Sequence, residues 1–166
     1  MAENRGKRFE QEIRKAFSKV QDVSIDRLHD QTTGYKNSSA NICDFIVYKK
    51  PHEYYIECKS VHGNTLPFTN ITDNQWNGMM EKCKINGVRA GVICWWIDHD
   101  ITLFIPIQLL TLLRENGKKS LRYDETFYGY NNINPYYVYS VYVVPGNKKR
   151  VFFDYDMTKF FELFGE

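Results

Sequence analysis

Residues 42–59 read ICDFIVYKKPHEYYIECK, and this stretch decides the fold that we expect for the chain. Two runs rich in β-branched and aromatic residues, 45–48 and 54–56, flank a polar cluster that contains Pro51. This pattern is typical of two strands joined by a tight turn, because proline cannot donate to the hydrogen-bond ladder of a central strand. The stretch therefore predicts a β-hairpin.

Three charged side chains lie at the open end of this predicted hairpin. Asp44 opens the first strand, and Glu57 and Lys59 close the second. Side chains alternate faces along a strand, so Glu57 and Lys59 share a face, and pairing of the strands brings Asp44 beside them. Neighbouring carboxylates repel each other unless a cation lies between them, and Mg²⁺ prefers oxygen ligands. Asp44 and Glu57 are therefore the candidate ligands for Mg²⁺, or for Mn²⁺ in its place.

The same three side chains suit the hydrolysis of a phosphodiester. A metal ion activates the attacking water, and Lys59 helps to stabilise the charge on the phosphorus oxygens. The alternative is a surface hairpin whose acid and lysine are merely solvated, because Glu-x-Lys is a common pattern in strands. The hairpin alone leaves both interpretations open.

Length and composition are those of one ordinary globular domain. The chain has 166 residues, 43% of them hydrophobic and 25% charged, which is enough for a buried core, and we expect a single domain over residues 1–166. The net charge of +2 does not by itself indicate a nucleic-acid partner, but six Lys or Arg lie within residues 1–20. A nuclease needs acids at its metal and bases on its flanks, so a net charge near zero is compatible with this function.

Cysteine usage and hydropathy predict a cytoplasmic protein. The four cysteines form no C-x-x-C pair, so we expect reduced core residues, and the four histidines lack zinc-ligand spacing. The amino terminus has no apolar run typical of a signal peptide, and no segment reaches membrane-spanning length. We therefore expect neither secretion nor a membrane partner.

Apolar residues at helical spacing predict an amphipathic helix over residues 5–20. Glu10 and Glu12 project in different directions around it, so one of them can face the hairpin acids, although solvation is the commoner fate of a helix glutamate. A second helix is expected from residue 73 to about residue 85, with Gln75 in its first turn. Gln75 then lies near the strand that carries Glu57, or is an ordinary first-turn polar residue.

The ends of this second helix also have candidate signals. Thr72 or Asp73 is a suitable N-cap, and Gly87 is a candidate C-cap.

A polar loop over residues 29–41 leads towards Asp44. It can contact phosphates, or it is only a solvated connector. Together with the basic amino terminus, it supplies the candidate DNA-binding residues Arg5, Lys7, Arg8, Arg27, Thr32, Thr33 and Lys36.

The remaining segments predict a sheet covered by helices. Strands are expected at residues 23–28, 88–97, 101–105 and 136–144, helices at 106–114 and 157–164, a basic connector at 116–123 and a loop at 131–135. We expect strands 88–97 and 101–105 to lie at the centre of the sheet. The order of elements indicates an α/β fold with a central mixed sheet flanked by helices.

Five segments, collinear over about residues 5–125, resemble the RecU-type Holliday-junction resolvases, a branch of the PD-(D/E)xK nuclease superfamily. They are GKRFE (6–10), Asp44-Phe45, Glu57-Cys58-Lys59, LPFTNITDNQ (66–75) and GKKSLRYDE (117–125). The resemblance implies a restriction-endonuclease-like fold and a Mg²⁺-dependent endonuclease that cuts four-way junctions as a homodimer.

Carried over to this sequence, the resemblance also implies roles for individual residues. Asp44 and Glu57 bind the metal, Lys59 assists the attacking water, and Glu10 and Gln75 complete the catalytic site. These resolvases have a long stalk before the motif aspartate, whereas here only about residues 30–41 are available. A shortened phage-type protein, acting in the host cytoplasm, would fit, with this loop as the candidate for branch-point recognition.

Two other functions remain as alternatives. A nicking or restriction-like DNA endonuclease without junction preference needs the same chemistry. A non-catalytic DNA-binding protein of the same fold is disfavoured, because paired acids near phosphates do not assist binding. For a dimer interface the chain offers Tyr136, Tyr137, Tyr139 and Tyr142, although a strand core is an equally good use for about half of them.

Overall fold

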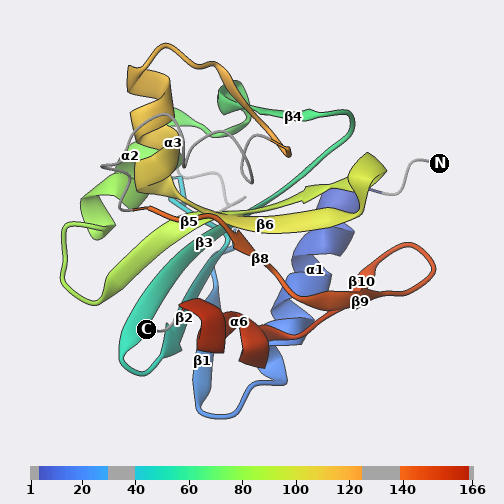
Figure 1. The fold of residues 1–166 in the computed structure, drawn as a ribbon. Helices are drawn as coiled ribbons and strands as arrows, with labels where there is room; N and C mark the ends of the chain where they lie inside the picture. The colour runs from blue at the N-terminus through green and yellow to red at the C-terminus, as the bar shows by residue number, and fades with distance from the viewer. Residues whose placement is uncertain (1–3, 30–39, 125–138, 165–166) are drawn as a thin grey trace, which may run out of the picture.

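A mixed six-stranded sheet forms the centre of the molecule (Figure 1). The computed structural model describes residues 4–29, 40–124 and 139–164. In spatial order the strands are β1 (Val23–Arg27), β2 (Phe45–Lys49), β3 (His52–Val61), β5 (Val88–Trp96), β6 (Ile101–Pro106) and β8 (Tyr142–Val143). β3 and β5 are parallel, and every other neighbouring pair in this sheet is antiparallel.

Helices cover both faces of the sheet. α1 (Arg5–Ser18) and α6 (Met157–Phe164) pack on one face, and α2 (Asp73–Lys82) and α3 (Ile107–Glu115) pack on the other (Figure 1). The sequence of β5 is almost continuously apolar because both of its faces are buried. Ile93 and Trp95 pack in the apolar cluster under α1 and α6, while Cys94 and Trp96 pack in the cluster under α2 and α3. A strand buried on both faces has no polar side to show. The predicted α/β class, with a mixed central sheet flanked by helices, is confirmed.

The predicted hairpin is present as β2 and β3. The two strands pair antiparallel, with Phe45 opposite Ile56 and Lys49 opposite His52, and the turn falls at Lys50 and Pro51. This register places Asp44 next to the part of β3 that carries Glu57 and Lys59. The predicted terminal helix is also confirmed, as α6.

Three predictions about other elements are wrong or incomplete. The centre of the sheet is β3 and β5 rather than β5 and β6, because β3 pairs on one side with its hairpin partner and on the other with β5. α2 ends at Lys82 with Cys83 as C-cap, so Gly87 is not its cap; Gly87, at φ 83°, lies in the turn before β5 and accepts a hydrogen bond from Glu53 N. The basic connector contains a strand, β7.

Two short antiparallel strand pairs lie outside the main sheet. β4 (Thr65–Pro67) pairs with β7 (Ser120–Arg122), and β9 (Gly146–Lys148) pairs with β10 (Phe153–Tyr155). The sequence analysis missed all four strands. The loop expected at residues 131–135 lies outside the described residues, as do Tyr136 and Tyr137, so the strand expected over 136–144 is seen only as β8.

All four cysteines are free thiols, two of them fully buried. Within the described ranges, no helix is both long and apolar enough to cross a membrane.

Candidate active site

Asp44 is held at the open end of the β2–β3 hairpin by backbone contacts on both sides. Its N–H donates to Ile56 O at 3.0 Å, and its carbonyl accepts from Leu28 N at 2.9 Å. Its carboxylate atom Oδ2 accepts from Cys58 N at 2.8 Å. The side chain is thereby fixed against β3 at Cys58, the residue between Glu57 and Lys59.

Glu57 is the most deeply buried member of the site, with a side chain that is 4% exposed. Its Oε1 accepts from Lys59 Nζ at 2.7 Å and from Gln75 Nε2 at 2.9 Å. Its Oε2 is buried and has no hydrogen-bond partner among the described residues. One oxygen therefore has two protein partners, and the other is open to a further group.

Gln75 is oriented by the start of α2. Thr72 is the N-cap of this helix: its Oγ1 accepts from Gln75 N, and Gln75 Oε1 in turn accepts from Thr72 N at 3.0 Å. This capping box satisfies two backbone donors at the helix end. Because Gln75 Oε1 is used in the cap, its amide NH₂ is directed at Glu57, which ties the position of α2 to the site.

Glu10 and Glu12 have different partners on α1. Glu10 accepts from Arg27 Nε at 2.8 Å, and its charge acts on both Asp44 and Glu57, whereas Glu12 accepts from Arg8 Nε at 3.1 Å. Glu10 is therefore the acid of this helix that lies towards the hairpin. Asp44, Glu57, Lys59, Gln75 and Glu10 are thus brought together.

Four of the candidate DNA-binding residues lie in the part of the chain that the structure describes. Arg27 pairs with Glu10 beside the site, a contact that nothing in the sequence signalled, because the two residues lie on different elements. Arg8 is engaged by Glu12 and by the ring of Phe152, 5.4 Å from its guanidinium. Arg5 and Lys7 are exposed on α1, and Thr32, Thr33 and Lys36 lie outside the described residues.

Burial and mutual repulsion disfavour the ionised forms of the two hairpin acids. Burial, followed by the charge of Glu57, raises the pKa of Asp44 from 3.8 to about 7. Burial also raises the pKa of Glu57, although the nearby Lys59 opposes this effect. Glu10 adds to the repulsion at both groups. A cation at this place would lower both pKa values.

The residues present fit a divalent metal held by two carboxylates. Across residues 4–29, 40–124 and 139–164, no group of three or more His, Cys, Asp or Glu side chains is arranged to hold a metal ion. Mg²⁺ does not require such a group, because it is usually bound through one or two carboxylates and keeps several waters. The unpartnered Oε2 of Glu57 and the repulsion between Glu57 and Asp44 are what such an ion would relieve.

The fold is similar to that of a solved resolvase. This structure is Hjc, a Holliday junction resolvase from the archaeal hyperthermophile Archaeoglobus fulgidus; the match covers 74% of this chain and 91% of Hjc, with 21% sequence identity and a TM-score of 0.48. No family model matches the sequence, and no curated protein matches it. At this level of similarity the function depends on the side chains described above rather than on the match.

The raised pKa of Asp44 predicts how the stability of the metal-free protein depends on pH. Between about pH 4 and pH 7 Asp44 keeps a proton in the folded chain that it releases in the unfolded chain, so its contribution to the free energy of unfolding falls as the pH rises. Asp44→Asn removes this loss, and we expect the variant to melt several degrees above the wild type at about pH 8 and close to it at about pH 4. Thermal denaturation in EDTA measures both.

Addition of Mg²⁺ at the higher pH provides the matching control. Because a ligand that binds only the folded state raises its stability, Mg²⁺ should raise the melting temperature of the wild type and leave that of Asp44→Asn almost unchanged. Equal melting temperatures for the wild type and Asp44→Asn at pH 8 without metal would contradict the assignment, because other acids such as Asp98 and Asp154, whose pKa values are lowered, are present in both proteins.

The two glutamates of α1 give a second prediction. Glu10→Ala should slow DNA cleavage, because Glu10 is the one whose charge reaches Asp44 and Glu57, while Glu12→Ala should cleave at the wild-type rate. Initial rates on the same DNA, at saturating Mg²⁺, compare the two variants. A slower initial rate for Glu12→Ala than for Glu10→Ala would mean that Glu12, and not Glu10, acts at the site.

Proposed function

We propose that this chain is a Mg²⁺-dependent endonuclease of the PD-(D/E)xK type that resolves four-way DNA junctions, in the manner of a short RecU-like protein. The observation that carries the proposal is the buried Glu57, whose Oε1 is bound by Lys59 and Gln75 while Oε2 has no partner in the described part of the chain. An unpaired, buried carboxylate oxygen is costly unless another group binds it. A purely structural hairpin has no reason to keep one.

Each residue of the site then has a defined part in phosphodiester hydrolysis. Asp44 and Glu57 would hold Mg²⁺, or Mn²⁺, which when bound polarises a phosphoryl oxygen and lowers the pKa of a water. Lys59 holds a positive charge 2.7 Å from Glu57 Oε1, where it can orient a water and stabilise an anionic phosphoryl oxygen.

The other contacts keep these groups in position. Cys58 N fixes the carboxylate of Asp44, and Gln75 fixes that of Glu57. Such preorganisation matters because donors and charges held in place do not have to reorganise during the reaction. Glu10 and Arg27 form a neighbouring ion pair at 2.8 Å, which balances the third acid of the site with a cation.

Junction resolution also requires two active sites. Two symmetric incisions are most simply made by a two-fold dimer that presents one site to each of two strands, so we propose a homodimer. Junction preference must come from the shape of the DNA, because linear duplex offers the same phosphates.

The decisive experiment compares an end-labelled four-way junction with its matched linear duplex, with and without Mg²⁺, together with the mass of the protein in solution. We expect Mg²⁺-dependent paired cuts near the branch point by a dimer, and slower cutting of the duplex. Equal cutting of both substrates, or an active monomer, would favour a simple nicking or restriction-like endonuclease. Binding without cleavage at any divalent metal would favour a non-catalytic DNA-binding protein.

A further inference from the structure

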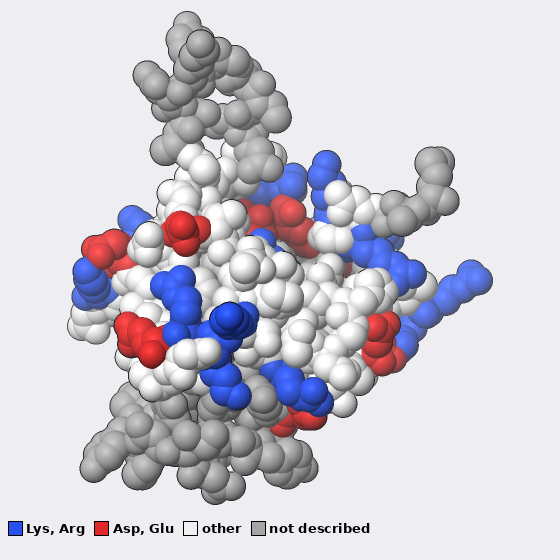
Figure 2. Space-filling model, turned by 90° about the horizontal axis from the view of Figure 1, so that it is seen from above, with Lys and Arg blue, Asp and Glu red and all other residues white. Residues whose placement is uncertain are grey.

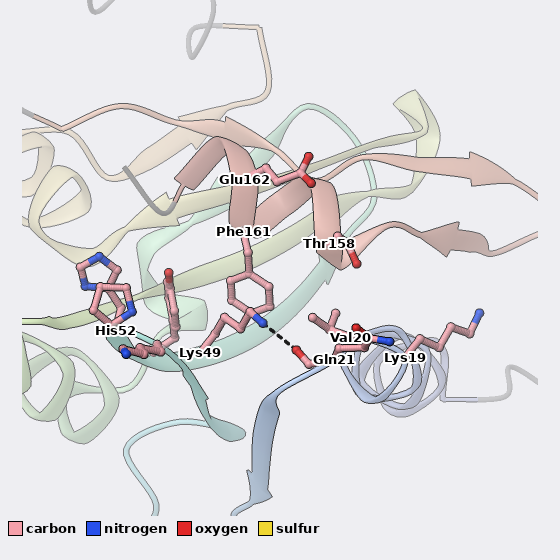
Figure 3. Close-up of a pocket in the computed structure, with 11 residues that line it drawn as sticks. Lys19, Val20, Gln21, Lys49, His52, Thr158, Phe161 and Glu162 are labelled. Carbon is pink, nitrogen blue, oxygen red and sulfur yellow. Dashed lines mark hydrogen bonds between the residues drawn. The ribbon is translucent and has the colours of Figure 1, made fainter.

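One cleft of the described chain is remote from the candidate active site. It has a volume of ≈ 690 Å³ and lies between the end of α1, the β2–β3 turn and α6 (Figure 3). Two of its lysines are already bound by the protein itself. Lys49 Nζ donates to Gln21 O at 2.6 Å, and Lys19 Nζ donates to Asp154 Oδ1 at 2.8 Å. His52, at its edge, is five residues from Glu57 along β3, or roughly 16 Å at about 3.3 Å per residue.

A second cleft, of ≈ 470 Å³, opens beside the first turn of α2. One wall is the segment from Phe68 to Asp73, and the other carries three basic side chains, Arg114, Lys118 and Lys119. The same helical turn carries Gln75, which donates to Glu57. One turn of helix is only about 5.4 Å long, so the cleft wall at Asp73 lies within one helical turn of the residue that binds Glu57.

Arg114 is held in position by the same helix. Its guanidinium carbon lies 3.8 Å from the ring centroid of Trp76, the residue that follows Gln75. Trp76 is itself buried, and its Nε1 donates to Thr111 Oγ1 of α3 at 2.8 Å. A guanidinium stacked on an aromatic ring keeps its in-plane N–H donors available for the paired hydrogen bonds that phosphate accepts.

The two lysines extend from a fixed stretch of backbone. Lys119 O accepts from Phe68 N at 2.9 Å, which joins the two walls of the cleft, and Lys118 N donates to Leu113 O at 3.0 Å, which ties the basic wall to the end of α3. Both lysines are exposed, and Asp73 is the acid among the residues that line the cleft. Figure 2 views the molecule from above, and several Lys and Arg side chains lie left of its centre, with Asp or Glu side chains beside them.

We propose that Arg114, Lys118 and Lys119 form a backbone clamp that binds DNA phosphates next to the scissile one. The clamp rests on the proposed function, and it adds the surface by which the substrate strand is positioned. Three cations facing one carboxylate complement a polyanion, and no base-reading group is needed because phosphate contacts set position rather than sequence. The clamp therefore acts alike on junction arms and on linear duplex.

The test measures DNA affinity at a series of salt concentrations in the absence of divalent metal, using labelled junction and labelled duplex. Each phosphate contact contributes about 0.9 to the slope of log K against log salt. Lys119→Gln and Lys118→Gln should each lower this slope by about that amount on both DNAs. In cleavage assays KM should rise while kcat at saturating DNA stays unchanged, as expected for a group that binds substrate and transition state equally.

Lys159→Gln is the matched control. Lys159 is an exposed lysine on α6, on the opposite face of the sheet, and its nearest carboxylate contact is at 3.9 Å. It should leave the slope and KM unchanged. Arg114→Gln removes a contact with Trp76 as well as a charge, so its melting temperature is measured alongside, and the two lysine variants decide the result if this protein unfolds.

The outcomes separate the clamp from the proposed function. A wild type that binds and cuts DNA, with wild-type salt slopes in both lysine variants, overturns the clamp alone. Equal losses in Lys159→Gln and Lys119→Gln also overturn it, because the effect is then one of net charge. A wild type that binds neither DNA overturns both the clamp and the nuclease.

Discussion

Asp44→Asn and Glu57→Gln are each expected to abolish DNA cleavage, with a loss of rate of at least about 10³-fold, or about 4 kcal/mol of barrier. Both substitutions remove a negatively charged metal ligand. They change the shape little, because Asn and Gln keep an oxygen that can accept the hydrogen bonds made by Cys58 N to Asp44 and by Gln75 to Glu57. Single-turnover cleavage of a four-way junction at saturating Mg²⁺ measures the effect.

DNA binding separates this result from simple unfolding. Removal of one negative charge near the phosphates should leave the affinity for DNA unchanged or slightly higher when divalent metal is absent. Glu12→Gln is the control, because Glu12 pairs with the exposed Arg8 and should keep full activity. Full cleavage by either Asp44→Asn or Glu57→Gln would exclude this pair as the metal ligands.

Lys59→Ala is expected to lower the chemical rate by roughly 10²-fold or more, with little loss of metal affinity, as when one preorganised charge-stabilising group is removed. The contact with Glu57 Oε1 adds a second effect. Lys59 lowers the pKa of Glu57, so its loss should raise this pKa further and make the remaining activity begin to fall at a higher pH. The pH profile of the single-turnover rate reports this shift.

Lys59→Arg is the comparison that identifies what the side chain contributes. It keeps the positive charge, so it should recover part of the rate and most of the wild-type pH profile. Metal affinity is followed separately, through the rise in melting temperature with Mg²⁺ concentration. If Lys59→Ala lost metal binding but reached the wild-type rate at saturating Mg²⁺, the lysine would be structural.

The sequence by itself determined the β2–β3 hairpin and the placement of three of its charged residues. Alternation of side chains along a strand is a local property, so Glu57 and Lys59 had to share a face once residues 52–61 formed a strand. The turn at Pro51 then set which residues pair, and this brought Asp44 to β3. The helical spacing of apolar residues in α1 and α6 is local in the same way, and it predicted where both helices lie in the sequence.

Only the tertiary structure decided which groups complete the site and which surface lies beside it. Arg27 meets Glu10 across 17 positions of sequence, Gln75 meets Glu57 across 18, and Trp76 meets Thr111 across 35. The parallel pairing of β3 with β5 and the short pair β4–β7 likewise join distant segments. Periodicity reports the environment of a residue along its own element, whereas such contacts depend on how separate elements pack, and this information is not present in any one stretch of the chain.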